Sequence, residues 1–100
     1  MEQEILAIAI VRPNEGMEQQ TLEVLRALYV VMTRKGYSRD RLYRDTIEPG
    51  RYFNLRYWSS DRSRREAQED PEVHKYWSRL GNLCVVETVY EQLVDITAEK

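Results

Sequence analysis

The feature that most constrains the fold is an unbroken apolar run near the N-terminus, Ile5-Leu6-Ala7-Ile8-Ala9-Ile10-Val11. Such a run is far too short to span a membrane and is typical of a β-strand that is covered on both faces. An amphipathic helix can cover one face of this strand. We therefore expect something else to cover the opposite face.

A long amphipathic helix is expected after this strand. Pro13 and Gly16 break the strand pattern, and Asn14 is placed to cap a helix that runs to about Lys35. Gly36 can adopt the left-handed conformation that ends a helix. Apolar and small residues recur at helical spacing over this range: Met17, Thr21, Leu25, Leu28 and Met32, with Leu22 and Tyr29 widening the stripe.

Two strands joined by a turn are predicted next. Residues 41–48 alternate in polarity, Pro49-Gly50 is a turn signal, and residues 51–58 return beside residues 41–48 as the second strand of a hairpin. Successive side chains of a strand point to opposite sides, so an amide, a guanidinium and an indole project together from the returning strand. This strand is therefore the best place to look for a site. The residues that share its polar face are Tyr52, Asn54, Arg56 and Trp58.

The remaining sequence predicts a broken helix and a last strand. Ser59-Ser60-Asp61 offers N-caps for a short polar helix, and Pro71 begins a second helical piece that Gly81-Asn82 stops. The last strand is expected from Leu83 to about Leu93. Its predicted faces are both largely apolar, with Leu83, Val85 and Val89 on one side and Cys84, Val86 and Tyr90 on the other.

The element order is βαββαβ, with the second helix broken at Pro71. Right-handed crossovers convert this order into a single ferredoxin-like α+β domain over residues 1–100, with a four-stranded antiparallel sheet and both helices on one face. The other sheet face would then expose a large apolar patch, which soluble monomers rarely tolerate. We therefore predict a homodimer through two-fold symmetric sheet-to-sheet packing.

Composition limits the classes of site. The chain holds one cysteine, Cys84, and one histidine, His74, so neither a disulfide framework nor a Cys/His zinc site is expected. The sequence indicates neither a membrane span nor a signal peptide, so we expect a cytoplasmic protein. Residues 34–65 carry ten basic and four acidic residues, but the net charge of the chain is −2, which favours ion pairing within the fold over binding of nucleic acid.

The chain resembles the antibiotic biosynthesis monooxygenase family of small dimeric α+β barrels. The resemblance lies in the first-strand run Ile5 to Val11, the long helix ending near Gly36, and above all Arg51-Tyr52-Phe53-Asn54-Leu55-Arg56-Tyr57-Trp58-Ser59-Ser60-Asp61. It covers nearly the whole length and implies the barrel fold. The family and its relatives include cofactor-independent quinone-forming monooxygenases, haem-degrading enzymes, isomerases and members without known activity.

In the quinone-forming members, an Asn and a Trp separated by three residues help to bind an aromatic polyphenol, which reacts with dioxygen without flavin or metal. Asn54 and Trp58 match that spacing, so the resemblance implies a monooxygenase of small aromatic molecules that needs no cofactor. An amide can hydrogen-bond a phenolate or enolate oxygen, and an indole supplies a flat apolar wall. Arg56 lies between them and either stabilises the same anion or pairs with Asp45 on the neighbouring strand.

The haem-degrading members use an Asn, a Trp and a His on the last helical segment. Here the position of that histidine falls on Trp77, about one helical turn after His74, so the resemblance disfavours haem degradation. His74 would still be the natural general base if it lined a pocket with Asn54, because an unperturbed histidine has a pKa of about 6.5. The candidate catalytic residues are therefore Asn54, Trp58 and His74, and the candidate substrate contacts are Tyr52, Arg56, Tyr76 and Trp77.

Two other classes of function remain open at this point. The same element order belongs to the RNA-recognition fold, and Gly50 to Tyr57 superficially resembles its base-stacking strand. The first strand, however, has no aromatic residue to supply a second stacking platform. A dimeric barrel that only binds a small metabolite, without catalysis, is the second alternative.

Overall fold

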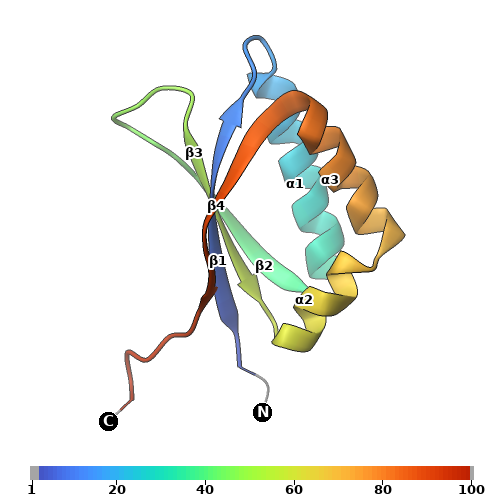
Figure 1. The fold of residues 1–100 in the computed structure, drawn as a ribbon, viewed down its shortest axis with the longest axis vertical. Helices are drawn as coiled ribbons and strands as arrows, with labels where there is room; N and C mark the ends of the chain where they lie inside the picture. The colour runs from blue at the N-terminus through green and yellow to red at the C-terminus, as the bar shows by residue number, and fades with distance from the viewer. Residues whose placement is uncertain (1–2, 100) are drawn as a thin grey trace.

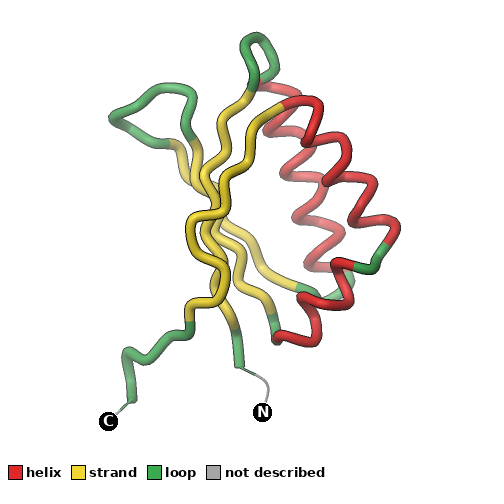
Figure 2. The backbone as a smooth tube through the Cα atoms, in the orientation of Figure 1, coloured by secondary structure: helices red, strands yellow, loops and turns green. Residues whose placement is uncertain are grey.

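The computed structural model describes residues 3–99 and confirms the predicted order of elements. Three helices lie together on one side of a four-stranded sheet, as Figure 1 and Figure 2 show. In chain order the elements are β1 (Ile5–Pro13), α1 (Glu18–Arg34), β2 (Ser38–Arg44), β3 (Tyr52–Trp58), α2 (Asp61–Gln68), α3 (Pro71–Leu83) and β4 (Cys84–Leu93).

The sheet has the strand order β2-β3-β1-β4, and every neighbouring pair is antiparallel. This is the ferredoxin-like arrangement that right-handed crossovers produce from the βαββαβ order. The central strands are β1 and β3, so the run Ile5 to Val11 and the strand that carries Asn54 lie side by side. Their register pairs Ala9 with Asn54 and Ala7 with Arg56.

The core lies between the sheet and the helices. Val11 of β1 and Tyr52 of β3 are paired across the sheet, and both are almost fully buried on its helix side. They meet the apolar stripe of α1, whose buried residues include Leu25, Leu28 and Met32. Burial of this stripe, at roughly 25 cal/mol for each Å² of apolar surface, is the main force that holds the helices on the sheet.

Helix α1 begins later than predicted. The backbone of Asn14 accepts a hydrogen bond from Met17 N, at 2.9 Å, within a turn where Gly16 has a φ of 80°. Asn14 therefore belongs to the turn before the helix, which starts at Glu18. The predicted end is confirmed, because Gly36 has a φ of 72° and Tyr37 N donates to Met32 O at 2.9 Å.

The hairpin is shifted relative to the prediction. Strand β2 spans Ser38–Arg44 instead of residues 41–48, because Asp45 Oδ1 accepts hydrogen bonds from the backbone N–H groups of Ile47 and Glu48 and ends the strand in a turn. Asp45 pairs with Arg51 beside that turn. The predicted alternative of an Arg56–Asp45 pair is therefore wrong.

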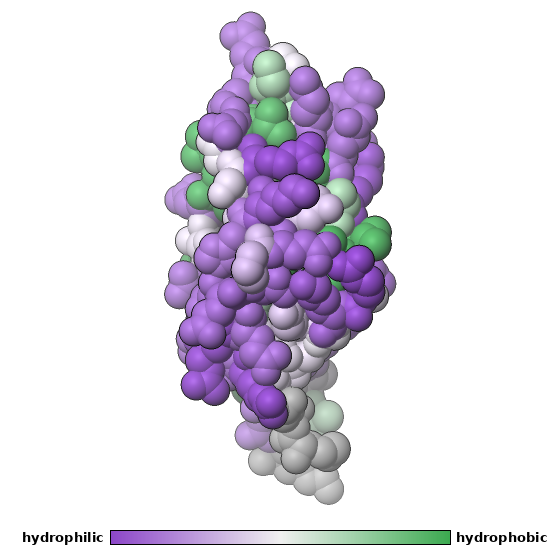
Figure 3. Space-filling view, turned by 90° about the vertical axis from the view of Figure 1, so that its right-hand side faces the viewer, coloured by the Kyte–Doolittle hydropathy of each residue, from purple (hydrophilic) through white to green (hydrophobic). Residues whose placement is uncertain are grey.

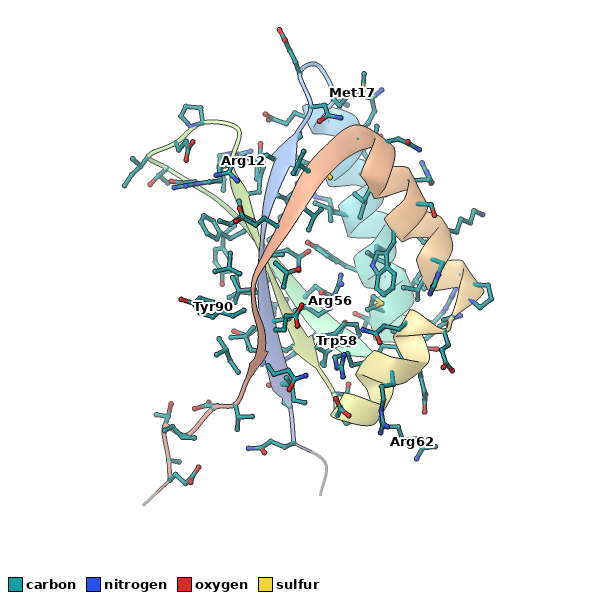
Figure 4. The ribbon with its side chains drawn as sticks, in the orientation of Figure 1. Arg12, Met17, Arg56, Trp58, Arg62 and Tyr90 are labelled. Atoms are coloured by element: carbon teal, nitrogen blue, oxygen red, sulfur yellow. The ribbon has the colours of Figure 1, made fainter. Side chains whose placement is uncertain are left out.

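The last helix and strand also differ from the prediction. Helix α3 continues through Gly81-Asn82 to Leu83 and runs directly into β4. Two register irregularities in the β1–β4 pairing then turn the strand, so that Tyr90 lies opposite Ile8. Figure 4 shows Tyr90 pointing away from the helices. The prediction that Tyr90 shares a face with Cys84 and Val86 is therefore wrong.

The two sides of the molecule differ in character. Figure 3 views the helix side, which is predominantly hydrophilic. No helix covers the opposite face of the sheet, which we call the outer face (Figure 1). Its exposed apolar residues include Val85 at 60% exposure and Tyr90 at 54%. The basic residues of this side are largely paired, since Arg12 contacts Glu87, Arg39 contacts Glu4 and Arg51 contacts Asp45.

No helix in residues 3–99 is long and apolar enough to cross a membrane.

Candidate functional site

A cavity of about 560 Å³ lies between the helix side of the sheet and the helices. Figure 4 shows Arg56 and Trp58 pointing from β3 into the space between these layers. Every strand except β2 contributes to the wall, and all three helices do. The lining residues that matter below are Asn54, Arg56 and Trp58 of β3, Arg64 and Gln68 of α2, Trp77 of α3, and Cys84 and Glu91 of β4.

Asn54 presents a hydrogen-bond donor to this cavity. Its side-chain oxygen accepts a hydrogen bond from the hydroxyl of Tyr29 on α1, at 2.5 Å. The residue is only 6% exposed, yet within residues 3–99 no acceptor contacts its amide nitrogen Nδ2. Because the oxygen is engaged by Tyr29, the NH₂ group is the end that remains available to a bound molecule.

Tyr29 remains a donor across the ordinary pH range. Burial of the hydroxyl raises the pKa of Tyr29 well above its usual value, and the nearby carboxylate of Asp40 raises it further. A hydroxyl that stays protonated fixes the orientation of the Asn54 amide.

Arg56 is held by a buried carboxylate. Its Nε donates to Oδ1 of Asp40 at 2.6 Å, and the two residues lie directly opposite each other on β3 and β2. The Asp40 side chain is fully buried and also accepts a hydrogen bond from Ser38, whereas the Arg56 side chain is 14% exposed. No acceptor in the described part of the chain contacts the two terminal guanidinium nitrogens. The outward end of the fork is therefore free.

Two indole rings supply flat apolar surface to the cavity. Trp58 is 5% exposed and lies beside the Arg56 guanidinium, whose carbon is 5.3 Å from the ring centroid. Trp77 approaches from α3 and is partly buried against the core. An aromatic molecule in the cavity would therefore meet an apolar wall beside the polar groups of Asn54 and Arg56 on β3.

The remaining predicted residues lie outside the cavity lining. His74 is exposed, its Nε2 contacts the backbone oxygen of Gln68, and its ring centroid is 5.4 Å from that of Trp77. Tyr52 lies on the same face of β3 as Asn54 but is buried in the core. Tyr76 packs against the core from α3. The structure thus brings together Asn54, Arg56, Trp58 and Trp77, and separates them from His74, Tyr52 and Tyr76.

Two residues that contact the lining side chains, Tyr29 and Asp40, were not predicted as site residues. Tyr29 was visible only as a widening of the α1 apolar stripe, and nothing local marks its hydroxyl as a partner of Asn54. Asp40 lies just before the predicted strand, which begins at residue 41, so the sequence pattern does not pair it with Arg56. The correct hairpin register places Asp40 opposite Arg56, and this register would have identified Asp40 as the partner of Arg56.

Cys84 also lines the cavity. Its thiol donates weakly to the backbone oxygen of Leu80 at 3.3 Å, and burial raises its pKa, so the thiol stays neutral. Across residues 3–99, no group of three or more His, Cys, Asp or Glu side chains is placed to hold a metal ion.

Solved structures similar to this chain share its arrangement of strands and helices. No family model matches the chain, and no curated protein matches it by sequence. Among solved structures it is similar to SnoaB, a cofactor-independent oxygenase from Streptomyces nogalater, with a TM-score of 0.81, 18% identity, and coverage of 97% of this chain and 99% of that one. A proposed antibiotic biosynthesis monooxygenase from Nitrosomonas europaea follows with a TM-score of 0.77, 11% identity and 93% of both chains covered.

A third similar structure is the protein SO0527 from Shewanella oneidensis, with a TM-score of 0.72 and 21% identity over 95% of this chain and 96% of that one. All three identities are low, and the agreement lies in the arrangement of strands and helices over nearly the whole chain. This chain therefore has the ferredoxin-like fold of the antibiotic biosynthesis monooxygenases, as its sequence resemblance implied.

Proposed function

We propose that the chain is a cytoplasmic, cofactor-independent monooxygenase that acts on a small aromatic or polyphenolic molecule in the cavity behind β3. One observation carries the proposal: the hydroxyl of Tyr29 occupies the side-chain oxygen of Asn54, which leaves an amide donor facing a cavity with indole walls. The likeness in fold to a cofactor-independent oxygenase supports the same reaction class.

The chemistry begins with the ionised substrate. An N–H donor aimed at a phenolic or enolic oxygen favours the anion over the neutral form, and the anion gives an electron to dioxygen more readily. In the oxidation of an anthrone to a quinone, one oxygen atom enters the ring carbon and the other leaves as water, with the hydrogens that the substrate loses. Asn54 would bind the oxygen that carries the charge, and Trp58 would hold the ring plane.

His74 has no assigned part in this proposal, because it does not line the cavity. The donors at the cavity wall favour a substrate that ionises on binding or arrives already ionised. The residues that carry the proposed reaction are therefore Asn54, Trp58, Trp77 and Tyr29.

We also propose that the active form is a homodimer joined through the outer face. Leu6, Ile8 and Ile10 pair along β1 with Tyr57, Leu55 and Phe53 of β3, and together they form the centre of that face. A contiguous apolar surface of this kind favours a two-fold symmetric contact with a second copy.

The test is oxygen consumption with anthrones and hydroquinones. Asn54→Ala is expected to lower the rate about 100-fold, the usual effect of removing one donor to a developing anion. Trp58→Phe keeps an aromatic ring but loses part of the wall, and a drop of about threefold to tenfold is expected.

The matched control is Asn82→Ala, an exposed amide near the end of α3. This variant should consume oxygen at the wild-type rate. Equal rates for wild type and Asn54→Ala would contradict the proposal. Binding of these compounds without any oxygen consumption would instead identify a non-catalytic binding protein.

A further inference from the structure

Arg56 presents the two terminal nitrogens of its guanidinium group, which form a fork of donors, to the cavity. Its inner nitrogen Nε is committed to Asp40 at 2.6 Å, and its terminal nitrogens have no acceptor within residues 3–99. A planar fork with two parallel donors matches the two oxygens of a carboxylate better than the single oxygen of a phenolate. A hydrogen bond to Asp40 holds this fork in place before a ligand arrives.

Two basic side chains of the cavity lining are candidates to meet an anion. Arg56 and Arg64 are basic and Glu91 is acidic, and each arginine is paired with a carboxylate outside the lining. Arg64 donates to Asp61 at the start of α2, which occupies part of its guanidinium, whereas the carboxylate that holds Arg56 lies behind the wall. Arg56 is therefore the cation best placed to meet a ligand.

The spacing along β3 separates two recognition points. Asn54 and Arg56 are two residues apart on one face, which places their backbones about 7 Å apart. A substituted benzene ring roughly spans this distance, and Trp58 lies beside the Arg56 guanidinium as a stacking surface. One substituent can then reach the Asn54 amide while another reaches the fork.

We propose that Arg56 is a specificity-determining residue that selects aromatic substrates bearing a carboxylate. The proposal rests on the oxygenase function for its setting, and it deepens that function by naming the substrate class. A carboxylate is ionised at neutral pH without help from a general base, which suits a cavity that no histidine lines. The neutral ester or amide of the same compound would leave the fork without a partner.

Isothermal titration calorimetry with gentisate and methyl gentisate tests this directly, because the two differ only in the carboxylate. Wild-type protein is expected to bind gentisate at least about tenfold more tightly, as a charge-assisted bidentate contact requires. Arg56→Met should abolish the preference, and Arg56→Lys should retain only part of it. Arg79→Met, at an exposed position of α3 outside this cavity, should keep it in full.

Removing Arg56 alone leaves the buried carboxylate of Asp40 without its partner. The double variant Asp40→Asn/Arg56→Met is therefore measured beside Arg56→Met, and circular dichroism establishes that both are folded. Loss of the preference in the folded double variant supports the proposal. Equal affinities of wild type for the acid and the ester, no binding of gentisate, or a preference that survives in the double variant would overturn it. Oxygen consumption with a neutral anthrone is scored separately, so that a failure of the oxygenase proposal is distinguished from a failure of the carboxylate selection by Arg56.

Discussion

Tyr29 and Asp40 determine how the cavity presents its polar groups, although neither is among the residues that line it. Tyr29 engages the oxygen of Asn54, and Asp40 engages the inner nitrogen of Arg56. In both pairs the partner engages one end of the side chain and leaves donors free at the other end. The cavity side of β3 therefore presents the Asn54 amide and the Arg56 guanidinium as hydrogen-bond donors, which favour an anionic oxygen.

We predict that Tyr29→Phe lowers oxygen consumption about tenfold through kcat, with KM changed less, because the amide of Asn54 loses its fixed orientation. The free energy of unfolding should fall by about 1 kcal/mol, the usual value of one hydrogen bond. Tyr76→Phe removes a hydroxyl from α3 outside the cavity lining, so it is the control and should change neither quantity.

A double-mutant cycle separates positioning from general damage. If Tyr29 acts through the Asn54 amide, Tyr29→Phe should have no further effect in the Asn54→Ala background. Independent, multiplicative losses in the rate would show that Tyr29 does not act by orienting that amide.

The carboxylate of Asp70 joins two of the helices that cover the cavity, α1 and α3. Asp70 caps α3 by accepting from Glu72 N at 2.9 Å, and it accepts from Lys35 Nζ and from the Tyr37 hydroxyl, both at 2.7 Å. Lys35 and Tyr37 directly follow α1, so Asp70 ties the C-terminal end of one helix to the N-terminal end of the other.

This junction makes stability sensitive to acid. The hydrogen bond from Lys35, followed by that from Tyr37, holds the pKa of Asp70 well below its usual range. A carboxyl with a depressed pKa stabilises the fold above its pKa in the unfolded chain, which is about 4. That contribution is lost as the pH falls below this value toward the folded pKa.

We therefore expect the free energy of unfolding of wild-type protein to fall more steeply between about pH 5 and pH 2 than that of Asp70→Asn, which keeps a capping side chain but not the charge. Urea denaturation at a series of pH values measures the difference. Glu69→Gln changes the exposed neighbouring carboxylate and should follow the wild-type curve. Parallel curves for wild type and Asp70→Asn would contradict the assignment.

The two faces of the sheet differ across the whole molecule. Its helix side encloses the cavity, and its outer face is open and apolar in a single chain (Figure 1). The turn between β2 and β3 and the segment after β4 both extend on the open side (Figure 2). A second copy seated on the outer face would leave both cavities accessible, because each lies on the far side of its own sheet.

The dimer is tested by sedimentation velocity at micromolar concentration, where wild-type protein is expected to sediment as a dimer. Tyr90→Glu places a charge on the outer face at a position already 54% exposed in the single chain, so it should yield a folded monomer. Val30→Glu, at a 66% exposed position of α1, should remain dimeric. A monomeric wild type would exclude this interface.

The order of elements, the antiparallel sheet and the grouping of Asn54, Arg56 and Trp58 on one strand face follow from the sequence alone. These features depend on local chemistry: apolar periodicity, the helix stop at Gly36, the cap offered by Ser59-Ser60-Asp61, the helix start at Pro71, and the alternation of side chains along a strand. They predict that three side chains project from one face of the strand, but they do not predict whether that face is turned toward the helices.

Only the tertiary structure decided which face of the sheet carries that group, because aromatic residues occupy both faces of β3. Burial of Val11 and Tyr52 against α1 places it on the helix side. Tertiary pairing also set the register that puts Asp40 opposite Arg56, turned Tyr90 outward, and left His74 exposed instead of in the cavity. These outcomes depend on contacts between residues far apart in the chain, which no local pattern encodes.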